Sequence, residues 1–176
     1  EELESGLEKG QVEEIRVFTY EKAAQLTAQC VPNDLAGKFS IPVSLAVLLE
    51  KGALTPATIR SCETEQAVRD RARHIWLYED ESYNRLLPDV RGGRLEILKS
   101  DGTVQVREVF HAAGDFDHPV PFTREKLEKK FRSNAAACLS AEEQQTLMNA
   151  VLQGDEWDTD VEQVLSVFYQ KTGETI

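Results

Sequence analysis

The chain has 176 residues, of which 41% are hydrophobic and 7% aromatic, enough to bury one good core with further helices attached to it. No apolar run approaches the roughly twenty residues of a membrane span, and the N-terminus lacks the pattern of a signal peptide, so we expect a soluble protein with no membrane partner. The formal net charge of −11 is concentrated at the two ends, and without a net basic face the chain is not expected to bind nucleic acid.

The first elements are a strand and a short helix. Apolar and polar side chains alternate from residue 15 to residue 20, which predicts a strand. Residues 21–29 then have the pattern of a short helix. The longest apolar stretch follows between residues 35 and 52, and its middle is apolar on every side of a helical wheel. It therefore predicts a short helix that is buried all round and lies at the centre of the fold.

The ends of this central helix carry clear signals. Ser40 can cap it, Pro42 fits a first turn that needs no intrahelical N–H, and Gly52 fits a left-handed end. Lys38 and Ser40 thus meet the positive end of a buried helix, where a carboxylate could bind. Capping of a core helix also explains both residues, so the two interpretations stay open.

Two short helices and a second strand come next. Thr55 followed by Pro56 is a helix-start signal, and residues 63–72 continue with helical periodicity. Residues 74–79 place Ile75 and Leu77 on one face, which predicts a strand. Residues 80–93 are polar and contain Pro88, so we expect a loop.

The clearest hairpin joins residues 94–99 to residues 103–110 through Asp101 and Gly102, because that pair supplies the positive φ of a tight turn. Together with the two earlier strands it gives a four-stranded, mainly antiparallel sheet with helices on one face. The predicted fold class is therefore α+β, a two-layer sandwich over residues 12–122.

The last third is predicted to be helical. Thr123 can cap a helix that carries Leu127 and Phe131, and Ser140 opens a capping box. The second of these helices is expected to turn Leu147, Met148, Val151 and Leu152 inward, and to end at Gly154. A final helix is expected to begin behind Asp158 or Asp160 and to carry one stripe made of Val161, Val164, Leu165 and Phe168. A two-layer domain does not need the last two helices, so the apolar faces of residues 123–172 are expected to pack on something absent from this chain.

No motif in the chain indicates a metal, a cofactor or a catalytic group. Asp115, Asp117 and His118 resemble ligands, but Gly114 and Pro119 bracket them as a turn. The histidines at positions 74 and 111 lack a nearby Cys or Asp partner, and phosphate-loop and nucleophile-elbow motifs are absent. The cysteines, three in number and widely spaced, predict reduced thiols in a cytoplasmic or organelle-matrix protein.

Three stretches resemble one family in the order in which that family has them. They are the Lys-Phe-Ser-Ile-Pro segment at 38–42 with its apolar helix, the hairpin at 94–104, and the loop from Gly114 to Pro119 with the helix residues 127–132. The chain resembles the second, C-terminal domain of MmgE/PrpD family enzymes, the group that contains 2-methylcitrate dehydratase and cis-aconitate decarboxylase. The similarity spans about residues 12–168.

The resemblance implies a cofactor-independent lyase or isomerase that acts on a di- or tricarboxylic acid by dehydration, epimerisation or decarboxylation. The family's main catalytic residues lie in a helical N-terminal domain and in the segment before the matched region, so no catalytic residue is expected here. The chain begins at Glu1 without an initiator Met, and it is expected to be the C-terminal part of a longer polypeptide, inactive alone. The implied partners are the carboxylate substrate and that N-terminal domain, with a homodimer possible.

The resemblance carries over to three positions as substrate-binding candidates, namely Lys38, Ser40 and Val43. Lys38 and Ser40 keep the family pattern, whereas many relatives have a substrate-facing tyrosine where this chain has Val43. A valine can neither donate a proton nor hydrogen-bond a carboxylate, so the substrate differs or the site is degraded. Two other classes stay open, a free-standing module that binds a small carboxylate at Lys38 and an assembly piece whose helical stripes join subunits.

Overall fold

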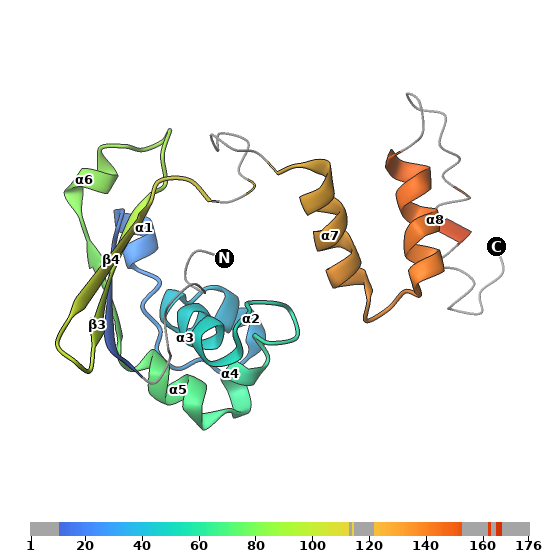
Figure 1. Cartoon of the computed structure of the whole chain (residues 1–176). Coiled ribbons are helices and arrows are strands. Elements are labelled where there is room, and N and C mark those ends of the chain that lie inside the picture. Colours follow the sequence, from blue (N-terminus) through green and yellow to red (C-terminus); the bar gives the residue numbers. More distant parts are fainter. Residues whose placement is uncertain (1–10, 113, 115–121, 153–161, 163–164, 167–176) are drawn as a thin grey trace. The chain divides into compact units, whose positions relative to one another are not determined.

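A computed structural model describes residues 11–112, 114, 122–152, 162 and 165–166. The chain divides into two compact units, Glu1–Asp117 and His118–Ile176 (Figure 1), which are described separately below. Asp115, Asp117 and His118 lie outside the described residues, as does most of the predicted final helix, Val161, Val164 and Phe168 included. No helix in the described part of the chain is long and apolar enough to cross a membrane.

The first unit is an α+β sandwich built on one open four-stranded sheet, as predicted. The strand order is β2-β1-β3-β4, and only the β1–β2 pair is parallel. Ile15 on the central strand β1 is flanked by Ile75 on β2 and Ile97 on β3. The strands are β1 (Val12–Thr19), β2 (Ile75–Glu79), β3 (Gly93–Lys99) and β4 (Val104–Val109).

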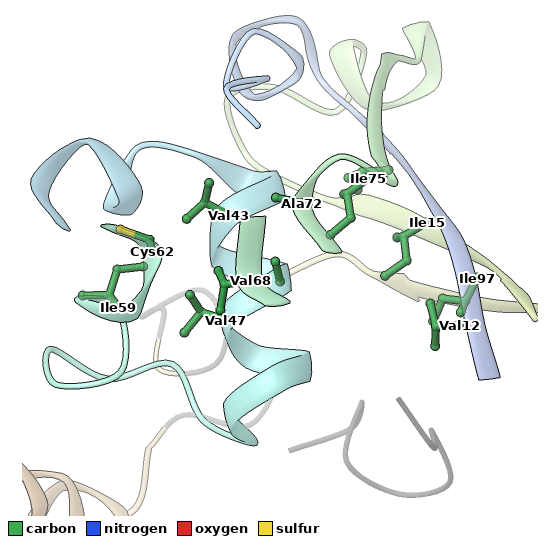
Figure 2. Close-up of a cluster of buried hydrophobic side chains, with 12 residues drawn as sticks. Val12, Ile15, Val43, Val47, Ile59, Cys62, Val68, Ala72, Ile75 and Ile97 are labelled. Carbon is green, nitrogen blue, oxygen red and sulfur yellow. The ribbon is translucent and has the colours of Figure 1, made fainter. Parts of the chain in front are cut away.

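Helices cover one face of this sheet and form the core with it (Figure 2). Ile15, Ile75 and Ile97 of the sheet are buried in the same cluster as Val47 of α3 and Val68 of α5. Burying side chains of this size stabilises the fold by about 1.5–3 kcal/mol each. The helices of this layer are α1 (Glu21–Ala24), α2 (Asp34–Lys38), α3 (Ile41–Lys51), α4 (Ser61–Thr64) and α5 (Gln66–Ala72).

The caps of α3 are those that the sequence predicts. The Ser40 hydroxyl accepts a hydrogen bond from the Val43 N–H, Pro42 lies in the first turn, and Gly52 ends the helix at φ 74°. The prediction that α3 is buried all round was wrong. Val43, Ala46 and Val47 are buried on one side, but the leucines of the helix are only half-buried, because the neighbouring elements cover one face of α3 and leave the other partly open.

Three helical segments differ from their sequence predictions. The helix expected over 21–29 ends at Ala24, after which the chain turns so that the Leu26 carbonyl can accept the Ile41 N–H. Residues 63–72 are split into α4 and α5 because Glu65 adopts an extended backbone between them. The loop expected over 80–93 contains a four-residue helix, α6 (Glu81–Asn84), which the Asp80 carboxylate caps at Ser82.

The second unit contains α7 (Arg124–Ala135) and α8 (Ala141–Leu152). Thr123 and Ser140 cap them as predicted, and Leu147 is buried together with Leu139. The prediction that Val151 points inward was wrong, since its side chain is exposed. In the described part of this unit α7 is the helix that packs against α8, and Phe131 and Ala135 of α7 contact the buried pair Leu139 and Leu147.

The hairpin and α6 are tied together by a buried tyrosine. Tyr83 on α6 is buried and donates a hydrogen bond of 2.6 Å from its hydroxyl to the Glu108 carboxylate on β4. Burial is the largest cause that raises the pKa of Tyr83 to about 12, and the neighbouring Glu108 carboxylate adds to it. The ordinary pKa of a tyrosine is about 10, so the folded protein holds this proton more tightly than the unfolded chain does.

We therefore expect a loss of stability at alkaline pH that depends on Tyr83. The contribution is fully present below about pH 10 and is lost as pH rises from about 10 to 12, because the unfolded chain ionises first. Urea unfolding of the wild type should show about 2–3 kcal/mol less stability across that range, whereas Tyr83→Phe should show a flatter profile. The matched control is Tyr78→Phe, at an exposed tyrosine, and an alkaline profile identical for all three proteins would refute the assignment.

Candidate functional site

The three predicted site residues lie at the junction of α2 and α3, but their side chains have different surroundings. Lys38 is the last residue of α2 and is exposed to solvent. Ser40 is the N-cap of α3 and only 1% exposed. Val43 lies one turn further on and belongs to the buried core cluster, where Figure 2 shows it on α3. Of the three, only Lys38 can meet a ligand from solvent without rearrangement.

Ser40 connects two segments of backbone. Its hydroxyl donates a hydrogen bond of 2.5 Å to the Ala28 carbonyl and accepts one of 3.1 Å from the Val43 N–H. The Ile41 N–H is bound to the Leu26 carbonyl, and Pro42 has no N–H. The free donors that usually make a helix N-terminus attractive to anions are therefore already engaged inside the protein. At this end of α3, a carboxylate would bind to the Lys38 ammonium rather than to the backbone.

The position of Lys38 depends on how α2 is held against α4. The Asn33 side chain caps α2 at Ala36, and the Glu63 carboxylate accepts the Asp34 N–H at 3.0 Å. A Cβ atom added at Gly37 would lie 3.1 Å from the Cys62 sulfur, which is tighter than an ordinary contact.

Cys62 itself is buried, and burial raises the pKa of its thiol. A thiol that keeps its proton is a poor nucleophile, because reactive cysteines need thiolate character. The geometry thus assigns Cys62 a packing role beside Gly37.

Two large apolar side chains lie close to Lys38 in the sequence, and neither was among the predicted site residues. Leu35 and Phe39 are 61% and 65% exposed, and they are one helical turn apart. We call these two residues the α2 patch. Their spacing of four was a visible signal, but both residues precede Ser40, the predicted start of the buried helix, and no exposed surface was predicted there. Exposed apolar side chains that gather around a polar group often mark a contact with a ligand or another domain.

A hollow lies at the start of β1, where β1 has an irregular register at Val12 and Glu14. Arg71 reaches into it, but its guanidinium is bound to the Glu50 carboxylate and to the Val12 carbonyl. His74 also lines this hollow. From α5, the arginine thus connects the end of α3 at Glu50 to the start of the central strand β1 at Val12. Among the described residues, no group of three His, Cys, Asp or Glu side chains could hold a metal ion.

The sequence was compared with models of protein families and with curated proteins. A family model described as MmgE/PrpD C-terminal domain matches residues 3–154. The match includes all the described elements from β1 to α8, and with them the α2–α3 junction. No curated protein matches the chain.

Ser40→Ala is expected to destabilise the first unit by about 2–3 kcal/mol, because it removes a cap and leaves two buried backbone groups without their partner. The control is Asn33→Ala, which removes the exposed cap of α2 and should cost about 1 kcal/mol. Chemical unfolding followed by circular dichroism measures both. An equal loss of unfolding free energy in the two variants would mean that the hydrogen bond from Ser40 to the Ala28 carbonyl does not stabilise the fold.

Gly37→Ala is expected to cost about 1–2 kcal/mol by crowding the Cys62 sulfur, and less in a Cys62→Ala background, where that contact is absent. The control is Gly52→Ala, which is strained by its φ of 74° and meets no atom within 4 Å. Its cost should be the same in both backgrounds. A double-mutant cycle by urea unfolding tests this, and a coupling energy of zero between Gly37 and Cys62 would contradict it.

Proposed function

The chain belongs to the MmgE/PrpD family, whose C-terminal domain it carries, and on that premise we propose that it is the smaller domain of a lyase or isomerase. The substrate class is a di- or tricarboxylic acid, and the reaction is a dehydration, an epimerisation or a decarboxylation, as in 2-methylcitrate dehydratase or cis-aconitate decarboxylase. The proposed role of this domain is to supply one wall of the substrate pocket. The main catalytic residues are proposed to lie in the helical N-terminal domain of the same polypeptide.

The exposure of Lys38 is the observation that carries the proposal. Its ammonium group is held on a short capped helix, and it lies next to a junction whose backbone donors are all engaged. A single exposed cation on a fixed element suits one carboxylate of a larger acid. Ser40 contributes by fixing the junction, so we assign it a positioning role in which it need not touch the substrate.

Val43 separates this chain from relatives that have a tyrosine at this position. The valine side chain is part of the core and offers no hydrogen bond. If substrate reaches this part of the pocket, it meets an apolar surface. In other members the tyrosine contacts a polar group of the substrate. We propose that the substrate of this protein lacks that group, or that the N-terminal domain binds it instead.

The α2 patch supports a contact with that N-terminal domain. Leu35 and Phe39 lie three residues before and one residue after Lys38, and a domain that covers them would bury apolar surface next to the lysine. The second unit has exposed apolar side chains of its own, Leu127 on α7 and Val151 on α8. We propose that these surfaces return to the N-terminal domain as well.

The alternative is a free-standing module that binds a small carboxylate at Lys38 or joins subunits without catalysis. The exposure of Lys38 in this chain also favours that alternative, since nothing needs to be removed before a ligand can reach it. Calorimetry of the chain alone with citrate separates the two. Binding that Lys38→Met abolishes would favour the module, and absence of binding would favour a pocket completed by another domain.

We expect Lys38→Met in the complete two-domain polypeptide to lower kcat/KM for its tricarboxylate substrate by about ten- to a hundredfold, because a hydrogen-bonded charge pair contributes about 1.5–3 kcal/mol. The matched control is Lys22→Met, which removes an exposed lysine from the end of α1. Steady-state kinetics on both variants measure the difference. An equal kcat/KM for Lys38→Met and Lys22→Met would remove Lys38 from the site.

A further inference from the structure

The break between α4 and α5 frees a backbone carbonyl, and a side chain of α5 binds it. In an uninterrupted helix the Glu63 carbonyl would accept a hydrogen bond from the N–H of residue 67, four positions later. Glu65 adopts an extended backbone there, and the Glu63 carbonyl accepts a hydrogen bond of 2.7 Å from the Arg69 guanidinium. The backbone of Glu63 is thus attached to α5 by a side chain.

Arg69 is itself held firmly. It follows Val68, a core residue that is 1% exposed. A second nitrogen of its guanidinium donates a hydrogen bond of 2.9 Å to the side-chain oxygen of Gln66. A planar guanidinium that makes two hydrogen bonds in a fixed geometry has little freedom to turn. Glu63 therefore takes its position from α5, which belongs to the core.

The Glu63 side chain extends this attachment to α2. Its carboxylate accepts the Asp34 N–H at 3.0 Å, from a residue 29 positions earlier in the chain. That N–H belongs to the first residue of α2, where a helix leaves backbone donors without partners of its own. A hydrogen bond to an ionised acceptor is stronger than one between neutral groups. Glu63 thus connects α5 to the start of α2.

α2 depends on its neighbours for its orientation. A helix of five residues is too short to be stable alone. Its buried residue is Gly37, which has no side chain to interlock with the neighbouring elements. Ser44 on α3 donates a hydrogen bond of 3.3 Å to the Gly37 carbonyl, and this attaches the end of α2 that carries Lys38. A helix attached at one end alone can still rotate about that end.

The bond to Asp34 attaches the other end of α2. With both ends held, the direction in which the Lys38 side chain leaves the helix is fixed as well. The Cys62 sulfur also lies 3.7 Å from the Asn33 carbonyl at this end, but a thiol is a weak donor. The hydrogen bond from Asp34 to the Glu63 carboxylate is the stronger of the two contacts.

We propose that Glu63 and Arg69 are positioning residues for the Lys38 site. Arg69 fixes Glu63, Glu63 fixes the start of α2, and α2 directs the Lys38 ammonium towards a substrate carboxylate that takes no part in the reaction. The inference rests on the proposed function, because it concerns the same carboxylate-binding site. Such a carboxylate is bound equally in the ground state and the transition state, so loosening Lys38 raises KM and leaves kcat unchanged.

The charge of Glu63 and its hydrogen bond have opposite effects on the binding of an anion. Loss of a negative charge near Lys38 favours anion binding, whereas loss of the hydrogen bond loosens α2 and weakens binding. Glu63→Ala removes both. Glu63→Gln removes only the charge, since the amide oxygen still accepts a hydrogen bond. The two variants have the same net charge, and the proposal predicts that only Glu63→Ala weakens binding.

Steady-state kinetics of the complete two-domain polypeptide with 2-methylcitrate or cis-aconitate test the role in binding. Glu63→Ala and Arg69→Ala should each raise KM about three- to tenfold, with kcat within about twofold of the wild type. Glu63→Gln should keep the wild-type KM. In a Lys38→Met background Glu63→Ala should raise KM no further, because the group that it positions is gone. A purely structural role would instead lower kcat through loss of folded enzyme and leave KM unchanged.

Two variants serve as matched controls. Glu65→Ala removes a carboxylate two positions from Glu63, but this carboxylate pairs with Lys51 on α3. Arg73→Ala removes an exposed arginine just after α5 and is the control for Arg69→Ala. Both variants repeat the change of charge without releasing α2, so both should keep the wild-type KM.

Nuclear magnetic resonance relaxation of the chain alone tests the positioning without any substrate. Glu63→Ala should lower the order parameters of the backbone N–H groups of residues 34–38, because the start of α2 is released. Glu63→Gln and Glu65→Ala should leave these order parameters as in the wild type. Circular dichroism verifies that each variant is folded.

Three results would overturn the inference. They are unchanged order of α2 in Glu63→Ala, a KM for Glu63→Gln as high as that for Glu63→Ala, and a further rise of KM when Glu63→Ala is added to Lys38→Met. If neither acid is turned over, or if Lys38→Met leaves kcat/KM unchanged, the proposed function fails. The relaxation measurement alone then decides whether Glu63 holds α2, so the two failures are distinguishable.

Discussion

Burial of one face of α3 is the interaction on which the rest of the first unit depends. Val43, Ala46 and Val47 are almost completely inaccessible, and the same cluster contains Val68 and Ala72 of α5 together with the isoleucines of the sheet. Because protein cores are packed as densely as organic crystals, these small side chains fix how closely the helices can approach the strands. The caps at Ser40 and Gly52 then determine where α3 begins and ends.

The position of the α2–α3 junction follows from this core. Ser40 is both the cap of α3 and the tether of residue 28, so the α2–α3 junction that presents Lys38 is set by the same hydroxyl that starts the core helix. α3 and α5 pack on one side of the sheet, whereas the other side is held by side-chain pairs such as Arg16 with Glu14 and by the hydrogen bond from Tyr83 of α6 to Glu108.

Much of the first unit could be predicted because its signals are local. The alternation along β1, the caps of α3 and the turn at Asp101 and Gly102 each depend on a few neighbouring residues, and the structure confirms all three. The family could be predicted from the order of its motifs. The break between α4 and α5 at Glu65 and the exposure of Val151 could not be predicted, since each depends on which other element lies nearby.

The candidate site was predictable in part for the same reason. Cap chemistry identified Ser40, but the engagement of its hydroxyl by a carbonyl twelve residues earlier is a tertiary contact. The exposure of Leu35 and Phe39 likewise depends on where α2 ends and how it lies on α4, which apolar periodicity alone does not reveal.

The strand order has a consequence for how this domain is made. β1 lies between β2 and β3, and both of its partner strands come from far along the chain. Ile15 pairs with Ile75 on the parallel strand β2, and Val12 pairs with Lys99 on the antiparallel strand β3. During synthesis β1 leaves the ribosome long before either neighbour, with both of its hydrogen-bonding edges unsatisfied. The sheet is a structure of high contact order, and such sheets form late and slowly. Until residue 99 has emerged, the nascent chain exposes a central strand that can pair with other chains, and this interval is when the domain is most open to aggregation and to protection by a chaperone.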